Sequence, residues 1–262
     1  MTPVLLPVAA VFGLVIGSFL NVVIARVPAG ESVVRPGSRC PRCGTPIAAR
    51  DNLPVLSWLL LRGRGRCCGA PISIRYPIVE LLTGLAFTGV AAWAGFGWRL
   101  PAFAYLAALS LALAVIDIDT FRLPFWLVAP SYPVAAVLLG AASLAEHDRQ
   151  SPIRALIGGA ALWTFYRLMH LVYPKGMGYG DVRLSGVLGM YLAWLGWDRL
   201  VVGAFLGFLV GGLGSAVMLA LRRTSLKSQI PYGPYMLAGA WLGVFLGHPV
   251  ASWYLRTAGL AG

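Results

Sequence analysis

The chain contains repeated apolar runs that are long enough to cross a lipid bilayer as helices. A transmembrane helix needs about 20 mostly apolar residues. Only 11% of the 262 residues are charged, whereas a soluble domain carries about 25%. We therefore predict an all-α polytopic membrane protein with about eight transmembrane helices, and we exclude a water-soluble enzyme. The expected segments are about 3–25, 76–97, 100–117, 125–145, 153–173, 182–197, 199–221 and 235–255.

One long hydrophilic segment, 26–75, separates the first two predicted spans and is rich in arginine. Because Lys and Arg accumulate in cytoplasmic loops, this segment is expected in the cytoplasm and the N-terminus outside. The first run is too long, and lacks the cleavage site, for a removable signal peptide. The predicted organisation is a first helix (1–25), a cytoplasmic loop (26–75) and a seven-helix bundle (76–262). Further basic residues follow the third, fifth and seventh spans: Arg122, Lys175, Arg183, Arg222, Arg223 and Lys227.

The net charge of +12 has two readings. In a soluble protein it suggests nucleic acid as a partner. In a membrane protein, basic cytoplasmic loops explain it through orientation and contact with anionic lipid. We therefore expect a lipid bilayer, and no nucleic acid, as the partner of these residues.

Two aspartates lie at the ends of predicted spans. Asp117 falls near the end of the third, in "LALAVIDIDTFRLP", and Asp181 at the start of the sixth, after "PKGMGYG". A charge within the bilayer costs about 2.5–3.5 kcal/mol on insertion scales, so such residues usually face a polar cavity or a partner. The predicted topology brings both to the cytoplasmic side, where one carboxylate can activate a water while the other stays protonated. A helix-capping role at a wet interface is the alternative, and it applies most to Asp119.

The glycines before Asp181 are expected to serve the same site. Gly178 and Gly180 leave the backbone uncovered and can adopt positive φ, so that a peptide can approach Asp181 closely. The segment "IPYGPY" (230–235) starts the last span and is a candidate wall of the same cavity.

Four cysteines lie in the hydrophilic segment. Cys40 and Cys43 form a Cys-x-x-Cys knuckle in "CPRCGTPI", and the pattern C-G-x-P-I recurs at Cys68 in "RCCGAPI". This spacing predicts a zinc site, since cytoplasmic thiols stay reduced. The second knuckle is irregular, with Gly65 at the position of its first cysteine and Cys67 beside Cys68. Adjacent side chains are expected to diverge, which makes Cys40, Cys43 and Cys68 the firmer ligands and Cys67 the fourth candidate; unmetallated or redox-active thiols are the alternative.

Glu80, in "IRYPIVELL", lies at the start of the second span. It is expected to pair with Arg75 and cap the helix, or else to contact a ligand.

Six blocks of the sequence together resemble the bacterial type IV prepilin peptidases. They are "GSFLNVVIARVP", "CPRCGTPI", "GAPISIRYPIVELL", "VIDIDTFRLP", "GMGYGDVRL" and "IPYGPY", in that family's order. The resemblance covers nearly the whole chain, and "GMGYGD" is similar to the Gly-x-Gly-Asp signature of intramembrane aspartyl proteases.

The resemblance implies an eight-helix inner-membrane enzyme that cuts the basic leader from prepilins or pseudopilins at the cytoplasmic face. It places the catalytic pair on Asp117 and Asp181 and gives Asp119 a supporting position. It also implies N-methylation of the new N-terminus with S-adenosylmethionine, and associates the blocks containing Gly17, Asn21, Arg75 and Glu80 with that activity. The family's loop carries two Cys-x-x-Cys pairs that bind zinc, and Gly65 departs from that pattern.

Three other functions stay open at this point. One is a peptidase without methyltransferase activity. Another is a proton-coupled transporter with Asp117 and Asp181 as a relay, which predicts carboxylates near the bilayer midplane and paired broken helices. The last is an inert anchor for pilus or secretion machinery.

Overall fold

The computed structural model describes the chain except residues 1, 41, 175, 221–229 and 260–262, so Lys175, Arg222, Arg223 and Lys227 lie outside the described residues. Throughout the described part, regular structure is helical apart from two isolated β-bridges, which confirms the all-α prediction. The elements are α1 (Thr2–Arg26), η1 (Ala49–Asn52), α2 (Leu56–Leu60), α3 (Arg75–Ala94), α4 (Arg99–Thr120), α5 (Phe125–Val128), α6 (Ser131–Ala145), α7 (Gln150–Val172), α8 (Tyr179–Leu195), α9 (Trp197–Ala220) and α10 (Gly233–Thr257).

Among the described helices, six stretches are long and apolar enough to cross a membrane. The expected segments 182–197 and 235–255 correspond to α8 and α10, which are outside that set. The chain therefore has the composition of a polytopic membrane protein. The six stretches are Val4–Arg26, Arg75–Ala94, Arg99–Thr120, Phe125–Ala145, Gln150–Val172 and Trp197–Ala220.

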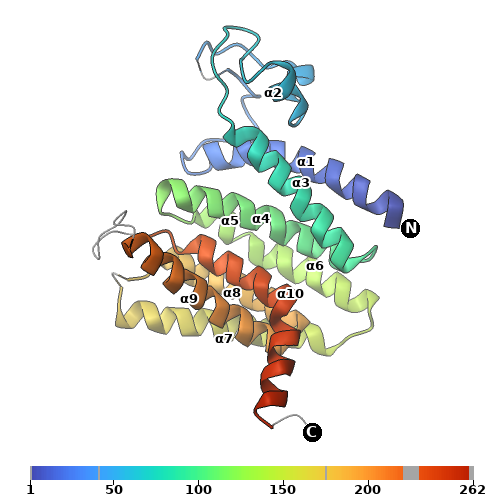
Figure 1. The fold of residues 1–262 in the computed structure, drawn as a ribbon, viewed down its shortest axis with the longest axis vertical. Coiled ribbons are helices and arrows are strands. Elements are labelled where there is room, and N and C mark those ends of the chain that lie inside the picture. Colours follow the sequence, from blue (N-terminus) through green and yellow to red (C-terminus); the bar gives the residue numbers. More distant parts are fainter. Residues whose placement is uncertain (1, 41, 175, 221–229, 260–262) are drawn as a thin grey trace. The chain divides into compact units, whose positions relative to one another are not determined.

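The chain forms two compact units, Met1–Ala112 and Leu113–Gly262, with the boundary inside α4. In the first unit, α1 and α3 pack against each other and the hydrophilic segment joins their ends (Figure 1). Gly13 and Gly17 of α1 allow the close approach, because a Cβ at Gly17 would lie 2.7 Å from the Cα of Glu80. Small residues at a helix–helix contact are the usual way to bring membrane helices together.

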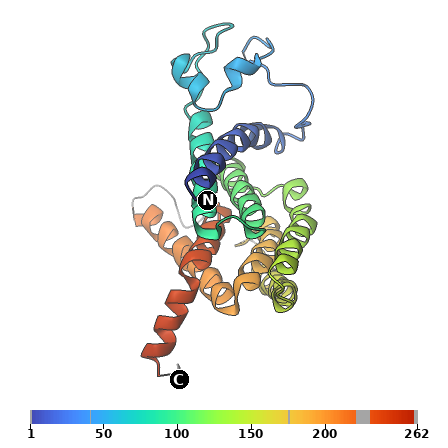
Figure 2. The ribbon, with the colours of Figure 1, turned by 90° about the vertical axis from the view of Figure 1, so that its right-hand side faces the viewer.

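In the second unit, α7 packs against α8, and α9 packs against α10. Glycines again make the contacts: a Cβ at Gly189 would lie 2.5 Å from the carbonyl oxygen of Gly158, and one at Gly243 would lie 2.6 Å from the Cα of Gly203. Helix α8 is almost entirely buried by its neighbours, whereas the end of α10 extends beyond them (Figure 2). Protein rather than lipid therefore surrounds α8, which explains how this short helix can carry a carboxylate.

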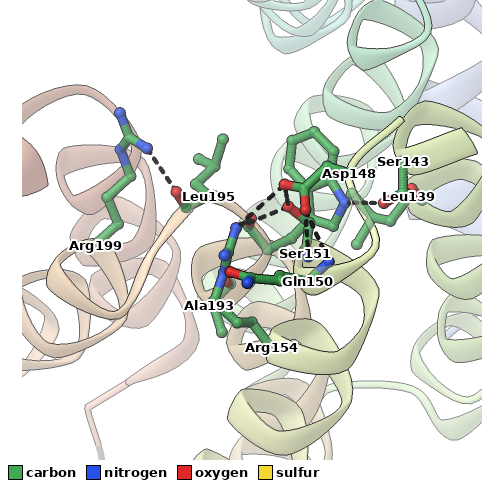
Figure 3. Close-up of polar contacts among 10 residues, drawn as sticks. Leu139, Ser143, Asp148, Gln150, Ser151, Arg154, Ala193, Leu195 and Arg199 are labelled. Atoms are coloured by element: carbon green, nitrogen blue, oxygen red, sulfur yellow. Dashed lines mark hydrogen bonds and ion pairs between the residues drawn. The ribbon is translucent and has the colours of Figure 1, made fainter. Parts of the chain in front are cut away.

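The C-terminal end of α8 is held by two arginines (Figure 3). Arg154 donates to the carbonyl of Ala193 at 3.4 Å and lies 3.5 Å from Asp148, and Arg199 donates to the carbonyl of Leu195 at 2.9 Å. Cationic donors suit the last carbonyls of a helix, because those groups have no intrahelical partner and carry partial negative charge. These contacts fix the end of α8 opposite to Asp181.

Candidate active site

Asp117 lies in the last turn of α4 and is buried, with 4% of its surface exposed. Its Oδ2 accepts a hydrogen bond from the backbone N–H of Gly233 at 2.9 Å. Gly233 is the first residue of α10, so the positive end of that helix faces the carboxylate. A larger residue there would force a shift, since a Cβ would lie 2.8 Å from Asp117 Oδ2.

Asp181 lies in the first turn of α8 and is 7% exposed. Its Oδ2 accepts the backbone N–H of Gly178 at 3.2 Å, so the side chain reaches back to the residue that precedes the helix, as the acidic member of a capping box does. The two glycines do not use the positive φ that glycine allows: Gly178 has a φ of −68°, and Gly180 is a helical residue outside the positive-φ set. The regular helix start at Tyr179 requires ordinary backbone angles.

The glycines matter instead because they have no side chain. A Cβ at Gly180 would lie 2.8 Å from the Cβ of Leu123, and a Cβ at Gly233 would lie 3.3 Å from the Cδ2 of the same leucine. Phe121, with a φ of +54°, turns the chain after α4 and so brings Leu123 to this position. Leu123 therefore lies between the start of α8, which carries Asp181, and the start of α10, whose Gly233 holds Asp117. The two aspartates are near enough for their charges to interact. Asp119, two residues from Asp117, is exposed.

Two tyrosines border the aspartates. The hydroxyls of Tyr166 in α7 and Tyr232, just before α10, are 3.3 Å apart, and Phe208 stacks on Tyr166 with ring centroids 5.4 Å apart. Both phenols interact electrostatically with Asp181. Sequence reasoning missed Tyr166, which lies inside an apolar run without a distinguishing pattern. For Tyr232 and Gly233 the sequence offered one indication, the Pro/Gly-rich segment "IPYGPY".

The first unit contains a second buried polar group. Glu80 is 8% exposed and accepts the backbone N–H of Val55 at 2.7 Å, and Asn21 donates to the carbonyl of Tyr76 at 3.1 Å. Val55 has a φ of +61°, which is strained for a β-branched residue. A buried carboxylate therefore holds the hydrophilic segment in an unfavourable backbone conformation. Arg75, the first residue of α3, is half-buried.

The four cysteine sulfurs lie within 4.8 Å of one another. The Sγ atoms of Cys67 and Cys68 are 3.8 Å apart, so the expectation that adjacent side chains diverge is wrong. Zn–S bonds of about 2.3 Å in a tetrahedron require sulfurs about 3.8 Å apart, and the cluster fits that requirement. A hydrogen bond with the Thr45 hydroxyl lowers the pKa of the Cys43 thiol to about 6, whereas hydrogen bonding to Cys43 raises that of Cys67 to about 12.

The helical fold and the buried carboxylates of Asp117 and Asp181 are those of a polytopic membrane protein with a two-aspartate site. Residues 11–94 match the family model described as the bacterial peptidase A24 N-terminal domain, and residues 104–216 match the type IV leader peptidase family.

Full-length relatives agree. Proteins named prepilin leader peptidase/N-methyltransferase are similar to this chain in Aeromonas hydrophila (38% identity over 93% of this chain and 91% of the relative) and Stutzerimonas stutzeri (37%, over 96% and 94%). The relative of that name in Myxococcus xanthus is 41% identical over 85% of this chain and 67% of its own. No solved structure gave a significant match. The chain belongs to the type IV leader peptidase family.

Proposed function

We propose that this protein cleaves the leader from type IV prepilins or pseudopilins and N-methylates the new N-terminal residue. The family match and the names of the full-length relatives support both activities. The structural observation that carries the peptidase assignment is the buried pair Asp117 and Asp181, which separate helices bring to one site.

The two carboxylates are held in the same way. Each has its Oδ2 bound to a glycine N–H, while within the described part of the chain its Oδ1 accepts no hydrogen bond. In a dry site two like charges interact strongly, so the pair holds one proton between them. The ionised carboxylate then takes a proton from a water that attacks the scissile carbonyl, and the protonated one donates to the carbonyl oxygen. No covalent enzyme intermediate is needed.

The position of the pair along the helices favours the peptidase over a transporter. Asp117 lies in the last turn of α4 and Asp181 in the first turn of α8, whereas a proton relay calls for carboxylates near the midplane. We propose that eight helices cross the bacterial inner membrane: the six apolar stretches together with α8 and α10. In this topology the N-terminus is outside, and the cysteine segment and both aspartates are cytoplasmic. A substrate helix in the bilayer then presents its basic leader to the catalytic face.

We assign the methyltransferase to the first unit, which contains the whole of the matched N-terminal domain. S-adenosylmethionine supplies an electrophilic methyl group for the released amine. Gly17, Asn21, Arg75 and Glu80 are the candidate residues: Gly17 sets the α1–α3 contact, and Asn21 and Glu80 fix the backbone around it. Zinc held by Cys40, Cys43, Cys67 and Cys68 would stabilise the adjoining segment.

Co-expression with a prepilin in a host that lacks its own peptidase tests the function, with mass spectrometry of the pilin N-terminus as the readout. Wild type should release the leader and add one methyl group. Asp117→Asn and Asp181→Asn keep the side-chain shape and should reduce cleavage at least about 1,000-fold, as loss of a catalytic group does. Asp198→Asn, in the first turn of α9, is the control. An uncut prepilin with wild-type protein contradicts the peptidase activity. A cut but unmethylated product supports the peptidase activity and contradicts the methyltransferase activity.

A further inference from the structure

The two cysteine turns of the first unit have the same backbone hydrogen bonds, shifted by 25 residues (40 to 65, 44 to 69, 45 to 70). In the first turn, Cys40 N–H donates to Thr45 at 2.9 Å and Gly44 N–H to Cys40 at 2.9 Å. In the second, the corresponding distances are both 2.8 Å. Matching β-bridges and matching positive φ values complete the repeat: Arg39–Pro46 and Arg64–Pro71, and Gly44 (+70°) and Gly69 (+66°).

This repeat identifies which positions are equivalent. Cys43 corresponds to Cys68, and Cys40 corresponds to Gly65. The second turn therefore has the same backbone as the first but has glycine, not cysteine, at the position equivalent to Cys40. Cys67, the remaining cysteine, corresponds to Arg42 of the first turn.

The sulfur of Cys67 lies beside the position that a side chain at residue 65 would take. A Cβ at Gly65 would have Cys67 Sγ at 3.9 Å. The same sulfur lies 3.2 Å from Cys43 Sγ and 3.8 Å from Cys68 Sγ, and Cys68 Sγ lies 3.6 Å from Cys40 Sγ. These separations are close to the roughly 3.8 Å between ligands of a tetrahedral zinc–thiolate centre.

We propose that Cys67 has taken over the ligand role of position 65, so that this chain completes a four-thiolate metal site with two adjacent cysteines in its second turn. The inference rests on the metal named in the proposed function and explains how its donor set is completed without a cysteine at position 65. It predicts that the ligand can be moved back. Gly65 tolerates a side chain, because a Cβ there meets nothing closer than the Ala70 oxygen at 3.7 Å and the backbone is outside the positive-φ set.

The test measures metal, not catalysis. Full-length protein is purified in detergent under reducing conditions, its zinc content is measured by mass spectrometry, and zinc affinity is obtained by competition with a chelator. Cobalt(II) replaces zinc to report the number of thiolates through its absorption spectrum. The variants are Cys67→Ser, the relocation variant Gly65→Cys with Cys67→Ser, and its matched control Gly65→Ala with Cys67→Ser.

Cys67→Ser should lower zinc affinity about 10-fold or more and shift the cobalt spectrum away from four-sulfur coordination, because one thiolate is lost. The relocation variant should restore both, and the Gly65→Ala control should restore neither. Unchanged affinity and spectrum in Cys67→Ser would overturn the proposal, as would a relocation variant that behaves like its control. Wild-type protein without bound metal would overturn both this inference and the proposed zinc site. Prepilin cleavage is assayed separately, so that absence of metal can be distinguished from failure of the peptidase assignment.

Discussion

The backbone N–H of Gly233 and the Oδ2 of Asp117 form a 2.9 Å hydrogen bond between residues 116 positions apart. This bond joins the start of α10 to the last turn of α4, so the position of one catalytic candidate depends on the far end of the chain. Asp181 obtains its equivalent bond locally, from Gly178. A backbone donor therefore orients each carboxylate, and this donor is distant in sequence for Asp117 but local for Asp181.

Gly233→Ala should disable the peptidase. The new Cβ would lie 2.8 Å from Asp117 Oδ2, so the carboxylate or α10 must shift. A displacement of about 1 Å in an active site can cost about 100-fold in rate, and we expect a loss of that order in kcat for prepilin cleavage. Gly212→Ala in α9, where a Cβ meets nothing within 4 Å, should behave as wild type. Normal kcat in Gly233→Ala would show that Asp117 does not need this geometry.

Tyr166→Phe should reduce cleavage more than its structural cost explains. The variant loses the hydroxyl contact with Tyr232, and a single hydrogen bond is worth about 0.5–1.5 kcal/mol of stability. Ser143→Ala removes the bond from Trp194 Nε1, at 2.8 Å, near the other end of α8, and is the matched control. Thermal unfolding in detergent should fall similarly in both, whereas kcat should fall only in Tyr166→Phe. Equal kcat values would leave the tyrosine pair with a packing role alone.

Glu80→Ala should separate the two activities. It removes the acceptor for Val55 N–H, and Val55 can then leave its strained φ, which costs about 1–3 kcal/mol to maintain. We expect methylation of the product to drop about 10-fold or more while leader cleavage continues, as measured by mass spectrometry of the pilin N-terminus. Glu80→Gln keeps an acceptor oxygen and should be intermediate. Glu31→Ala, at an exposed position of the same hydrophilic segment, is the control, and parallel loss of both activities in Glu80→Ala would contradict the separation.

Asp148 should stabilise the start of α7 in a pH-dependent way. Hydrogen bonds from the Ser151 hydroxyl and from the N–H groups of Gln150 and Ser151 lower the pKa of its carboxyl group. Because the folded pKa is below the unfolded value of about 3.9, the contribution is fully present above that value and is lost as pH falls through the folded pKa. Asp148→Asn should therefore lower the unfolding temperature at pH 6, and the difference from wild type should shrink below about pH 4. A difference that is independent of pH would rule out this linkage.

Sequence patterns were enough to predict that the protein is helical and that Asp117 and Asp181 belong to one site. Apolar run length predicts membrane helices because the bilayer sets one required length, and the charge pattern of the loops placed Asp117 and Asp181 on the same side. The same reasoning could not tell which backbone angles the glycines adopt, and it misjudged the adjacent cysteines. Gly178 and Gly180 have ordinary backbone angles, and adjacent Cys67 and Cys68 converge.

The sequence by itself determined that this chain is a helical membrane protein and which residue types are candidates for its chemistry, because those properties follow from local composition and spacing. Only the tertiary structure decided that Gly233 supports Asp117, that Leu123 fits against both Gly180 and Gly233, and that Tyr166 meets Tyr232. These contacts join segments far apart in the chain. They depend on how α4, α7, α8 and α10 pack, which is a balance over many side chains that no short sequence pattern contains.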